Sequence, residues 1–211
     1  MSIERLTREP LSIGIELPLD NDWSTSGQLK RQQDGRPFGV PDMSEHAARI
    51  KLADELGFRA AWVRDVPLYD PDFGDAAQVF ETFTYLGYLS SLTRNILLGT
   101  AAVVLPLRQP WLVRKAASTL QTLSGDRLLL GVASGDRPVE YPLFGADYAA
   151  RGENFRTSVG ILKGKPTARS SLDCACCHAA AAAAGRRVGA ANARVGGQKY
   201  GWLAVVSRHA C

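Results

Sequence analysis

Two carboxylates stand at the ends of short apolar segments, where a parallel α/β fold places its chemistry. Glu16 lies near the end of the apolar stretch 11–17, and Asp65 follows the apolar stretch 60–63. A carboxylate held in a pocket can transfer protons, so both residues are candidate catalytic groups. Each also has a structural interpretation. Glu16 can pair with an arginine inside the fold, and Asp65 can cap a helix or form an ion pair with Arg64 or another neighbour.

A second candidate site is a small turn after a later apolar segment. Ser134, Gly135 and Asp136 follow the stretch 127–133, and their backbone N–H groups could approach a phosphate. Ser-Gly is also ordinary composition for a turn between strand and helix, so the turn alone is weak evidence. The sequence has no G-x-G-x-x-G after its first apolar segment, no G-x-S-x-G and no H-E-x-x-H. We predict that His46, beside an apolar helix position, is a surface or packing residue.

The elements that must position these residues alternate between strand and helix. Apolar runs predict strands at residues 11–17, 60–63, 96–105 and 127–133. Helical spacing of apolar residues predicts helices at residues 42–57, 75–95, 110–125 and 151–162. Capping boxes are predicted at Asp42 with Glu45 and at Asp75 with Gln78.

This β-α-β-α-β-α-β-α order predicts an α/β fold with a parallel sheet and right-handed crossovers. A doubly wound sheet and a (β/α)8 barrel both fit the order. In both architectures ligands bind at the carboxyl ends of the strands, where Glu16, Asp65 and the Ser134 turn lie.

Composition divides the chain near Gly164. Over its 211 residues the chain is 45% hydrophobic and 22% charged, an ordinary globular balance. Residues 1–164 carry 18 Lys and Arg against 20 Asp and Glu, a net charge of −2, whereas residues 165–211 carry 7 against 1, a net charge of +6. No apolar run reaches the ~20 residues of a membrane-spanning helix, and the first ten residues lack the apolar centre of a signal peptide. We therefore expect a cytoplasmic protein without a membrane partner.

The segment 165–211 is low in complexity and rich in Ala, Arg and Cys. It holds all four cysteines and the alanine run 179–184. The spacing of Cys174, Cys176 and Cys177 matches structural zinc sites poorly, and the scattered arginines match a nucleic-acid surface poorly, so we expect neither metal nor nucleic acid. This composition is typical of a frame not selected as protein. We interpret the segment as a frameshifted or disordered tail, with a short strand at 202–206.

One stretch carries a family resemblance. Residues 99–135 read GTAAVVLPLRQPWLVRKAASTLQTLSGDRLLLGVASG. This segment resembles the bacterial luciferase-like monooxygenases, a flavin- or deazaflavin-dependent (β/α)8 TIM-barrel family, and is nearest to the luciferase-type oxidoreductases. The ordered motifs lie at Thr100–Pro106, Arg108–Pro110, Leu123–Arg127 and Phe144–Gly152. By the resemblance, residues 1–164 are the N-terminal half of such a barrel, about four βα units, here truncated.

The resemblance also implies a cofactor and its site. FMN, with a deazaflavin as the alternative, would lie against a non-prolyl cis peptide at Ala101–Ala102, beside Thr100. Its phosphate would lie near Ser134, Gly135 and Asp136, with Arg137 a candidate for neutralising it. Val66 stands where luciferases carry a catalytic histidine, so light emission is not expected.

The implied function is a monooxygenase or oxidoreductase that uses reduced flavin and O2 on a small organic substrate. A flavin reductase would supply the reduced flavin, and a homo-oligomer is a further expectation. Two alternatives stay open. The chain could be an inactive half-barrel that binds little or no flavin, or a binding module that uses its basic tail.

Overall fold

Parallel strands alternate with helices along the chain, as the sequence predicts. The computed structural model describes residues 2–8, 11–19, 24–36, 40–68, 80–164, 190–191 and 203–205. The strands are β1 (Gly14–Leu17), β2 (Ala60–Val63), β3 (Leu97–Thr100), β4 (Val103–Val104) and β5 (Leu128–Ala133), followed by β6 (Ala190–Ala191) and β7 (Leu203–Val205). The helices are α1 (Ser2–Leu6), α2 (Thr25–Gln33), α3 (His46–Glu55), α4 (Thr82–Leu92), α5 (Pro110–Leu123) and α6 (Arg151–Leu162), with 3-10 turns η2 (Leu105–Leu107) and η3 (Pro138–Phe144).

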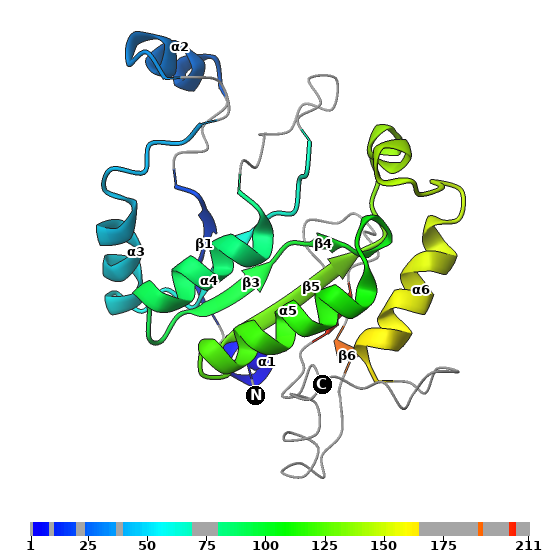
Figure 1. The fold of residues 1–211 in the computed structure, drawn as a ribbon. Helices are drawn as coiled ribbons and strands as arrows, with labels where there is room; N and C mark the ends of the chain where they lie inside the picture. The colour runs from blue at the N-terminus through cyan, green and yellow to red at the C-terminus, as the bar shows by residue number, and fades with distance from the viewer. Residues whose placement is uncertain are drawn as a thin grey trace.

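The sheet follows the order of the chain. Its strand order is β1-β2-β3-β5-β7-β6, with β4 also paired to β5. Strands β1 to β5 pair in parallel, whereas β7 runs antiparallel to β5. A doubly wound sheet reverses its strand order at a switch point. The order β1-β2-β3-β5 has no such reversal, so the described parallel strands form a continuous wall of a barrel (Figure 1).

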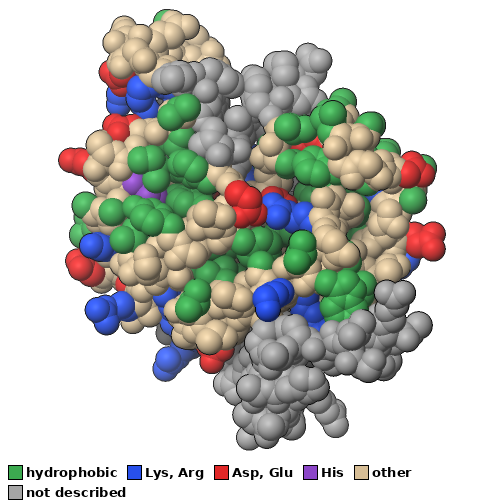
Figure 2. Space-filling model, viewed as in Figure 1, with side chains coloured by type: hydrophobic (Ala, Val, Ile, Leu, Met, Phe, Trp, Pro, Cys, Tyr) green, Lys and Arg blue, Asp and Glu red, His purple; other side chains and the backbone are tan. Residues whose placement is uncertain are grey.

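The helices and the sheet enclose the larger core on the outer face of this wall. There α4 and α5 lie over the strands (Figure 1), and the buried cluster includes Leu86, Leu98, Ala117, Leu130 and Leu162. Figure 2 shows acidic and basic side chains beside one another near the middle of this side of the molecule. The inner face carries a smaller cluster of Ala60, Leu97 and Leu129, against which Leu6 and Trp62 pack.

Trp62 occupies a slot between two glycines on the inner face. In the strand register it lies between Glu16 of β1 and Gly99 of β3. A Cβ atom added at Gly99 would lie 2.3 Å from Cε3 of Trp62, and one at Gly14 would lie 2.8 Å from Nε1. The neighbouring strands therefore need residues without side chains to accommodate the indole ring.

Two buried polar side chains join the loop between α4 and β3 to its surroundings. The carboxylate of Asp54 accepts hydrogen bonds from the backbone N–H groups of Arg94, Asn95 and Ile96, at 2.7, 2.9 and 2.6 Å. Arg127 donates to the carbonyl oxygens of Ser90, Thr93 and Ile96. These contacts satisfy backbone groups that the helix end and the strand start leave unpaired.

Several predicted boundaries are confirmed and others are wrong. Helix α6, strand β2 and the start of α5 at Pro110 lie where the sequence predicts. Asp42 does not cap α3, because its carboxylate accepts from the N–H of Ser44 and closes a turn before the helix. Asp75 and Gln78 lie outside the described residues, and α4 is instead capped by Glu81, which accepts from the N–H of Thr84. Helices α1 and α2 were not predicted.

The region after Gly164 is described only at β6 and β7. The strand expected at 202–206 is found as β7 and pairs with β5 through Leu130, Gly131 and Val132. All four cysteines lie outside the described residues. Among the helices that the structure describes, none combines the length and apolar character needed to cross a bilayer.

Candidate functional site

A β-bulge interrupts the third strand at the carboxyl edge of the sheet. From Gly99 to Val103 the chain advances by four residues, whereas its partner β5 advances by three, from Leu129 to Val132. One extra residue is therefore looped out between β3 and β4. The Ala101–Ala102 peptide within this bulge is cis, as the resemblance implies. Ala101 is exposed at the edge and Ala102 is buried.

The side chain of Thr100 forms hydrogen bonds with β5 where the bulge interrupts the backbone pairing. Its hydroxyl donates to the carbonyl oxygen of Gly131 at 2.7 Å and accepts from the N–H of Gly131 at 2.9 Å. A Cβ atom at Gly131 would lie 2.2 Å from the carbonyl oxygen of Thr100. The hydroxyl of Thr100 thus pairs with the backbone of Gly131, and the close approach of the two strands leaves no room for a side chain at residue 131.

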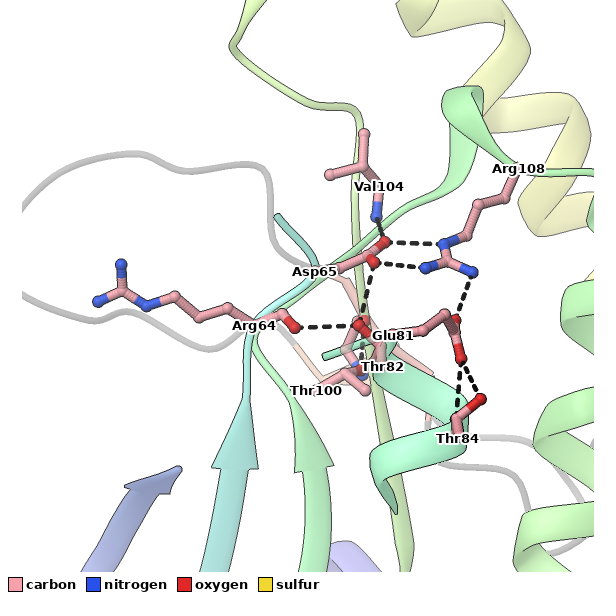
Figure 3. A network of polar contacts seen from close by, with 9 residues as sticks. Arg64, Asp65, Glu81, Thr82, Thr84, Thr100, Val104 and Arg108 are labelled. Carbon is pink, nitrogen blue, oxygen red and sulfur yellow. Dashed lines mark hydrogen bonds and ion pairs between the residues drawn. The ribbon is translucent and has the colours of Figure 1, made fainter. Parts of the chain in front are cut away.

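Asp65 lies at the centre of a polar network beside the bulge (Figure 3). Its Oδ2 accepts from the N–H of Val104 at 3.1 Å and from Nε of Arg108 at 2.9 Å. Its Oδ1 accepts from the hydroxyl of Thr82 at 3.0 Å and from Nη2 of Arg108 at 2.5 Å. The ion pair is therefore bidentate, the geometry that suits a guanidinium best. The predicted partner Arg64 contributes its carbonyl oxygen, which accepts from the hydroxyl of Thr82.

Arg108 extends this network to the start of α4. Its Nη1 lies 2.9 Å from Oε1 of Glu81, while Oε2 of Glu81 accepts from the N–H and the hydroxyl of Thr84. Burial alone would raise the pKa of Glu81, but the hydrogen bonds from Thr84 and Arg108 outweigh it and hold that pKa below its ordinary value. Burial alone would lower the pKa of Arg108, but its two carboxylate partners raise it above the ordinary value. Both groups are charged at neutral pH.

Glu16 forms a separate ion pair on the inner face of the sheet. Its Oε1 lies 2.6 Å from Nε of Arg64, and the two side chains are 45% and 35% exposed. Glu16 therefore has the arginine partner that its structural interpretation expects, and its carboxylate also reaches solvent. Figure 3 shows the Arg64 side chain extending away from the Asp65–Arg108 pair.

The Ser134 turn is shaped by a buried tyrosine. Gly135 has a φ of 80°, and the hydroxyl of Tyr141 donates to the carbonyl oxygen of Ser134. Burial raises the pKa of Tyr141 to about 12, so this donor keeps its proton at neutral pH. A Cβ atom at Gly135 would lie 2.5 Å from the Tyr141 hydroxyl and 2.7 Å from Cγ1 of Val104.

The charged residues after this turn differ in exposure. Asp136 is exposed, whereas Arg137 is buried and lies 3.8 Å from Glu140. The guanidinium of Arg137 also donates to the carbonyl oxygen of Leu68 at 3.5 Å. The one cation that sequence reasoning offered for a phosphate is therefore already engaged by a carboxylate.

The predicted site residues converge through Val104. Its N–H reaches Asp65, and its side chain approaches Gly135, so the bulge lies between these two candidates. Sequence reasoning missed Arg108, Thr82 and Glu81 as members of this site. Arg108 stands within the quoted R-x-P motif, and that was the available signal; Thr82 and Glu81 had none.

His46 is a further residue that the sequence singled out. It is 3% exposed, and its Nε2 shares a 2.8 Å hydrogen bond with the hydroxyl of Tyr85. Of its two predicted roles, packing is therefore confirmed. His46 does not join the candidate site.

Curated relatives match part of the chain. It is 34% identical to an uncharacterised protein of Mycobacterium tuberculosis over 103 residues, which is 47% of this chain and 36% of the relative. It is 27% identical to the F420-dependent glucose-6-phosphate dehydrogenase of Amycolatopsis mediterranei over 130 residues, which is 60% of this chain and 38% of the relative. The chain therefore spans well under half the length of these relatives.

Solved structures share the fold. A monooxygenase from Streptomyces bottropensis aligns with a TM-score of 0.55 at 21% identity, over 71% of this chain and 41% of that one. The oxygenating constituent of 3,6-diketocamphane monooxygenase from Pseudomonas putida, solved in complex with FMN, aligns with a TM-score of 0.53 at 15% identity, over 74% and 40%.

Residues 21–187 match the sequence profile of one family, so the match continues beyond Gly164. The profile covers more than half of the chain and includes the bulge, the Asp65 network and the Ser134 turn. The strand order and the cis peptide in the third strand agree with this match. The chain therefore belongs to the luciferase-like monooxygenase family.

Proposed function

We propose that the chain binds a flavin-type cofactor at the bulge and serves an oxidoreductase or monooxygenase reaction on a small organic substrate. The observation that carries the proposal is the small-residue bulge at Ala101–Ala102, exposed at Ala101 and placed between a carboxylate network and a glycine turn. FMN is the cofactor proposed first, because the Pseudomonas putida enzyme is solved with FMN. A deazaflavin is the alternative, because the Amycolatopsis mediterranei relative is F420-dependent.

The residues at the edge fit a flat, phosphate-bearing ring system. Ala101 offers only a methyl group to whatever lies over the bulge, so a planar ring can lie on the backbone. The backbone of Ser134, Gly135 and Asp136 forms a turn with a left-handed glycine, the kind of concavity that binds anions through N–H groups. Tyr141 holds this turn through a hydrogen bond to the Ser134 carbonyl oxygen.

The chain's own chemistry would act beside the ring. When bound, a flavin supplies the redox step itself. We propose Glu16 as the residue that moves a proton to or from the substrate, since its carboxylate is on the inner face and reaches solvent. Arg64 orients that carboxylate through their ion pair. Reduced cofactor would come from a separate flavin reductase, and the functional unit is proposed to be a homo-oligomer.

Cofactor binding by the purified full-length chain tests the proposal. We expect FMN or F420 fluorescence to be quenched on titration, and saturating cofactor at 100 times its Kd to stabilise the fold by about 2.7 kcal/mol. Ala101→Trp places an indole over the bulge and should abolish binding. Ala48→Trp, at an exposed position on α3, is the matched control and should bind as the wild type does.

The opposite result is equally informative. If neither cofactor binds at saturating concentration, the proposal fails and a half-barrel without flavin function is supported. If Ala101→Trp binds as tightly as Ala48→Trp, the cofactor binds elsewhere than at the bulge.

A further inference from the structure

We infer that Asp65, with Arg108, is a positioning residue that holds the bulge in place, and that Asp65 is not a proton-transfer group. The inference rests on the proposed function, because the bulge is the proposed flavin surface. It replaces the catalytic role that the sequence suggested for Asp65 by a mechanical one.

The first support is the state of the Asp65 carboxylate. Its side chain is 6% exposed, and its two oxygens accept from the hydroxyl of Thr82, the N–H of Val104 and both Nε and Nη2 of Arg108. Four donors converge on one carboxylate, so no exposed lone pair faces a reacting atom. A general base must lie within hydrogen-bond reach of the proton that it removes, and here protein donors occupy that space. Glu16, by contrast, has a side chain that is 45% exposed.

The second support is the position of the contacts along the bulge. Before the cis peptide, the N–H of Ala101 donates to the carbonyl oxygen of Val63 at 2.8 Å. After it, the N–H of Val104 donates to Asp65 at 3.1 Å. Both ends of the bulge are therefore tied to the end of β2, the second by a side chain where the backbone ladder to β2 has ended.

The third support is the connection of this tie to a helix. Arg108 forms ion pairs with both Asp65 and Glu81, and Glu81 caps α4. Thr82, the first residue of α4, donates a hydrogen bond directly to Asp65. The bulge, the end of β2 and the start of α4 thus share one charged network (Figure 3). A bulge without this network could move relative to β2, and small displacements in a site are costly to its function.

Amide hydrogen exchange of the cofactor-free chain tests the inference without reference to flavin. Asp65→Asn keeps the size of the side chain but removes the charge and one acceptor. We expect exchange at the amides of Val104 and Ala101 to accelerate about tenfold or more, since their local opening becomes easier. The amide of Leu98, in the regular part of β3, should not change. Unchanged exchange at Val104 would overturn the inference.

FMN titration then tests whether the Asp65–Arg108 ion pair affects cofactor binding at the bulge. Asp65→Asn and Arg108→Ala should each weaken FMN binding about tenfold to a hundredfold. The double variant should bind FMN no more weakly than the single variant with the lower affinity, because both substitutions remove the same ion pair. Glu45→Ala, which removes the exposed Glu45–Arg49 pair on α3, is the matched control and should bind normally. Bound FMN should also show an altered visible spectrum in both single variants.

The outcomes separate the two proposals. If the wild type binds no flavin while Val104 exchange still responds to Asp65→Asn, the proposed function fails and the positioning of the bulge stands. If Asp65→Asn binds FMN as the wild type does but loses turnover together with one limb of its pH profile, Asp65 is a proton-transfer residue and the inference is wrong.

Discussion

Asp54 shows how one side chain can secure a turn that has no regular secondary structure. It is 8% exposed and accepts from three consecutive backbone N–H groups between α4 and β3. We expect Asp54→Ala to lower the free energy of unfolding by roughly 3 kcal/mol, because one buried and two partly buried N–H groups lose their acceptor. Urea denaturation measures the change. Glu55→Ala, at the exposed neighbouring position, should cost far less, and equal losses in the two variants would contradict this role.

The stability of the fold depends on pH through the side chain of His46. Burial, and secondarily the charge of Arg49, lowers the pKa of His46 below its ordinary value of 6.5. The folded state therefore favours the neutral ring that hydrogen-bonds to Tyr85, and the unfolded state takes up the proton first as the pH falls. The contribution of His46 is complete above about pH 6.5 and is lost as the pH falls from there through the lowered pKa.

The His46→Gln variant isolates this contribution. Stability measured against pH should fall more steeply on the acid side in the wild type than in the variant, while the two curves run parallel above about pH 7. Curves that stay parallel down to about pH 5 would show that the protonated ring is tolerated in the folded state.

At the scale of elements, two glycines of the wall face different obstacles. A Cβ atom at Gly99 meets the ring of Trp62, whereas one at Gly131 meets the backbone of Thr100. We expect Gly99→Ala and Gly131→Ala each to cost about 1–3 kcal/mol or more through overpacking. Trp62→Leu should relieve only the first, with a coupling of about 1 kcal/mol or more in a double-mutant cycle of unfolding free energies. Equal relief of Gly131→Ala would contradict this assignment.

Elements whose bounds depend on nearby residues could be predicted from the sequence, whereas a feature that depends on the pairing of two strands could not. Helix α6 and strand β2 are marked by local apolar spacing, and Pro110 marks the start of α5, so their bounds follow from nearby residues. The run 96–105 looks like one strand, since a looped-out residue does not alter its apolar character. Only pairing with β5 reveals the bulge, because the slip is a property of two strands.

The candidate site was predictable in place but not in its partners. Strand ends gave the positions of Glu16, Asp65 and the Ser134 turn, because parallel strands share one functional edge. Arg64 is adjacent to Asp65 in the chain, yet Asp65 binds Arg108, 43 residues away. Arg64 and Asp65 both follow the end of β2, and the Arg64 side chain extends away from the Asp65–Arg108 pair (Figure 3). Arg108, just after the 3-10 turn η2, reaches Asp65 instead.

At the scale of the whole molecule, strand β7 from the later part of the chain covers the β5 edge of the described parallel strands. Strand β7 pairs with β5 in antiparallel register, although residues 165–211 differ in composition from the rest. We expect a chain ending at Gly164 to self-associate, because the unpaired edge of β5 becomes a template for another strand. Light scattering of the shortened and full chains at matched concentrations measures this. A monomeric shortened chain would mean that β7 does not protect the edge.

Trp62 and its two glycines also constrain how this sequence can change over time. The indole ring fills the volume above Gly14 and Gly99, so a mutation that adds a side chain at either glycine is harmful while the ring is present. The order of substitutions then matters most at Gly99, where the three atoms nearest an added Cβ all belong to Trp62: residue 62 must become smaller before residue 99 can grow. The residue types allowed at three positions that are distant along the chain thus depend on one another. A relative that has lost the tryptophan can carry larger side chains on the inner face of the sheet than this chain can.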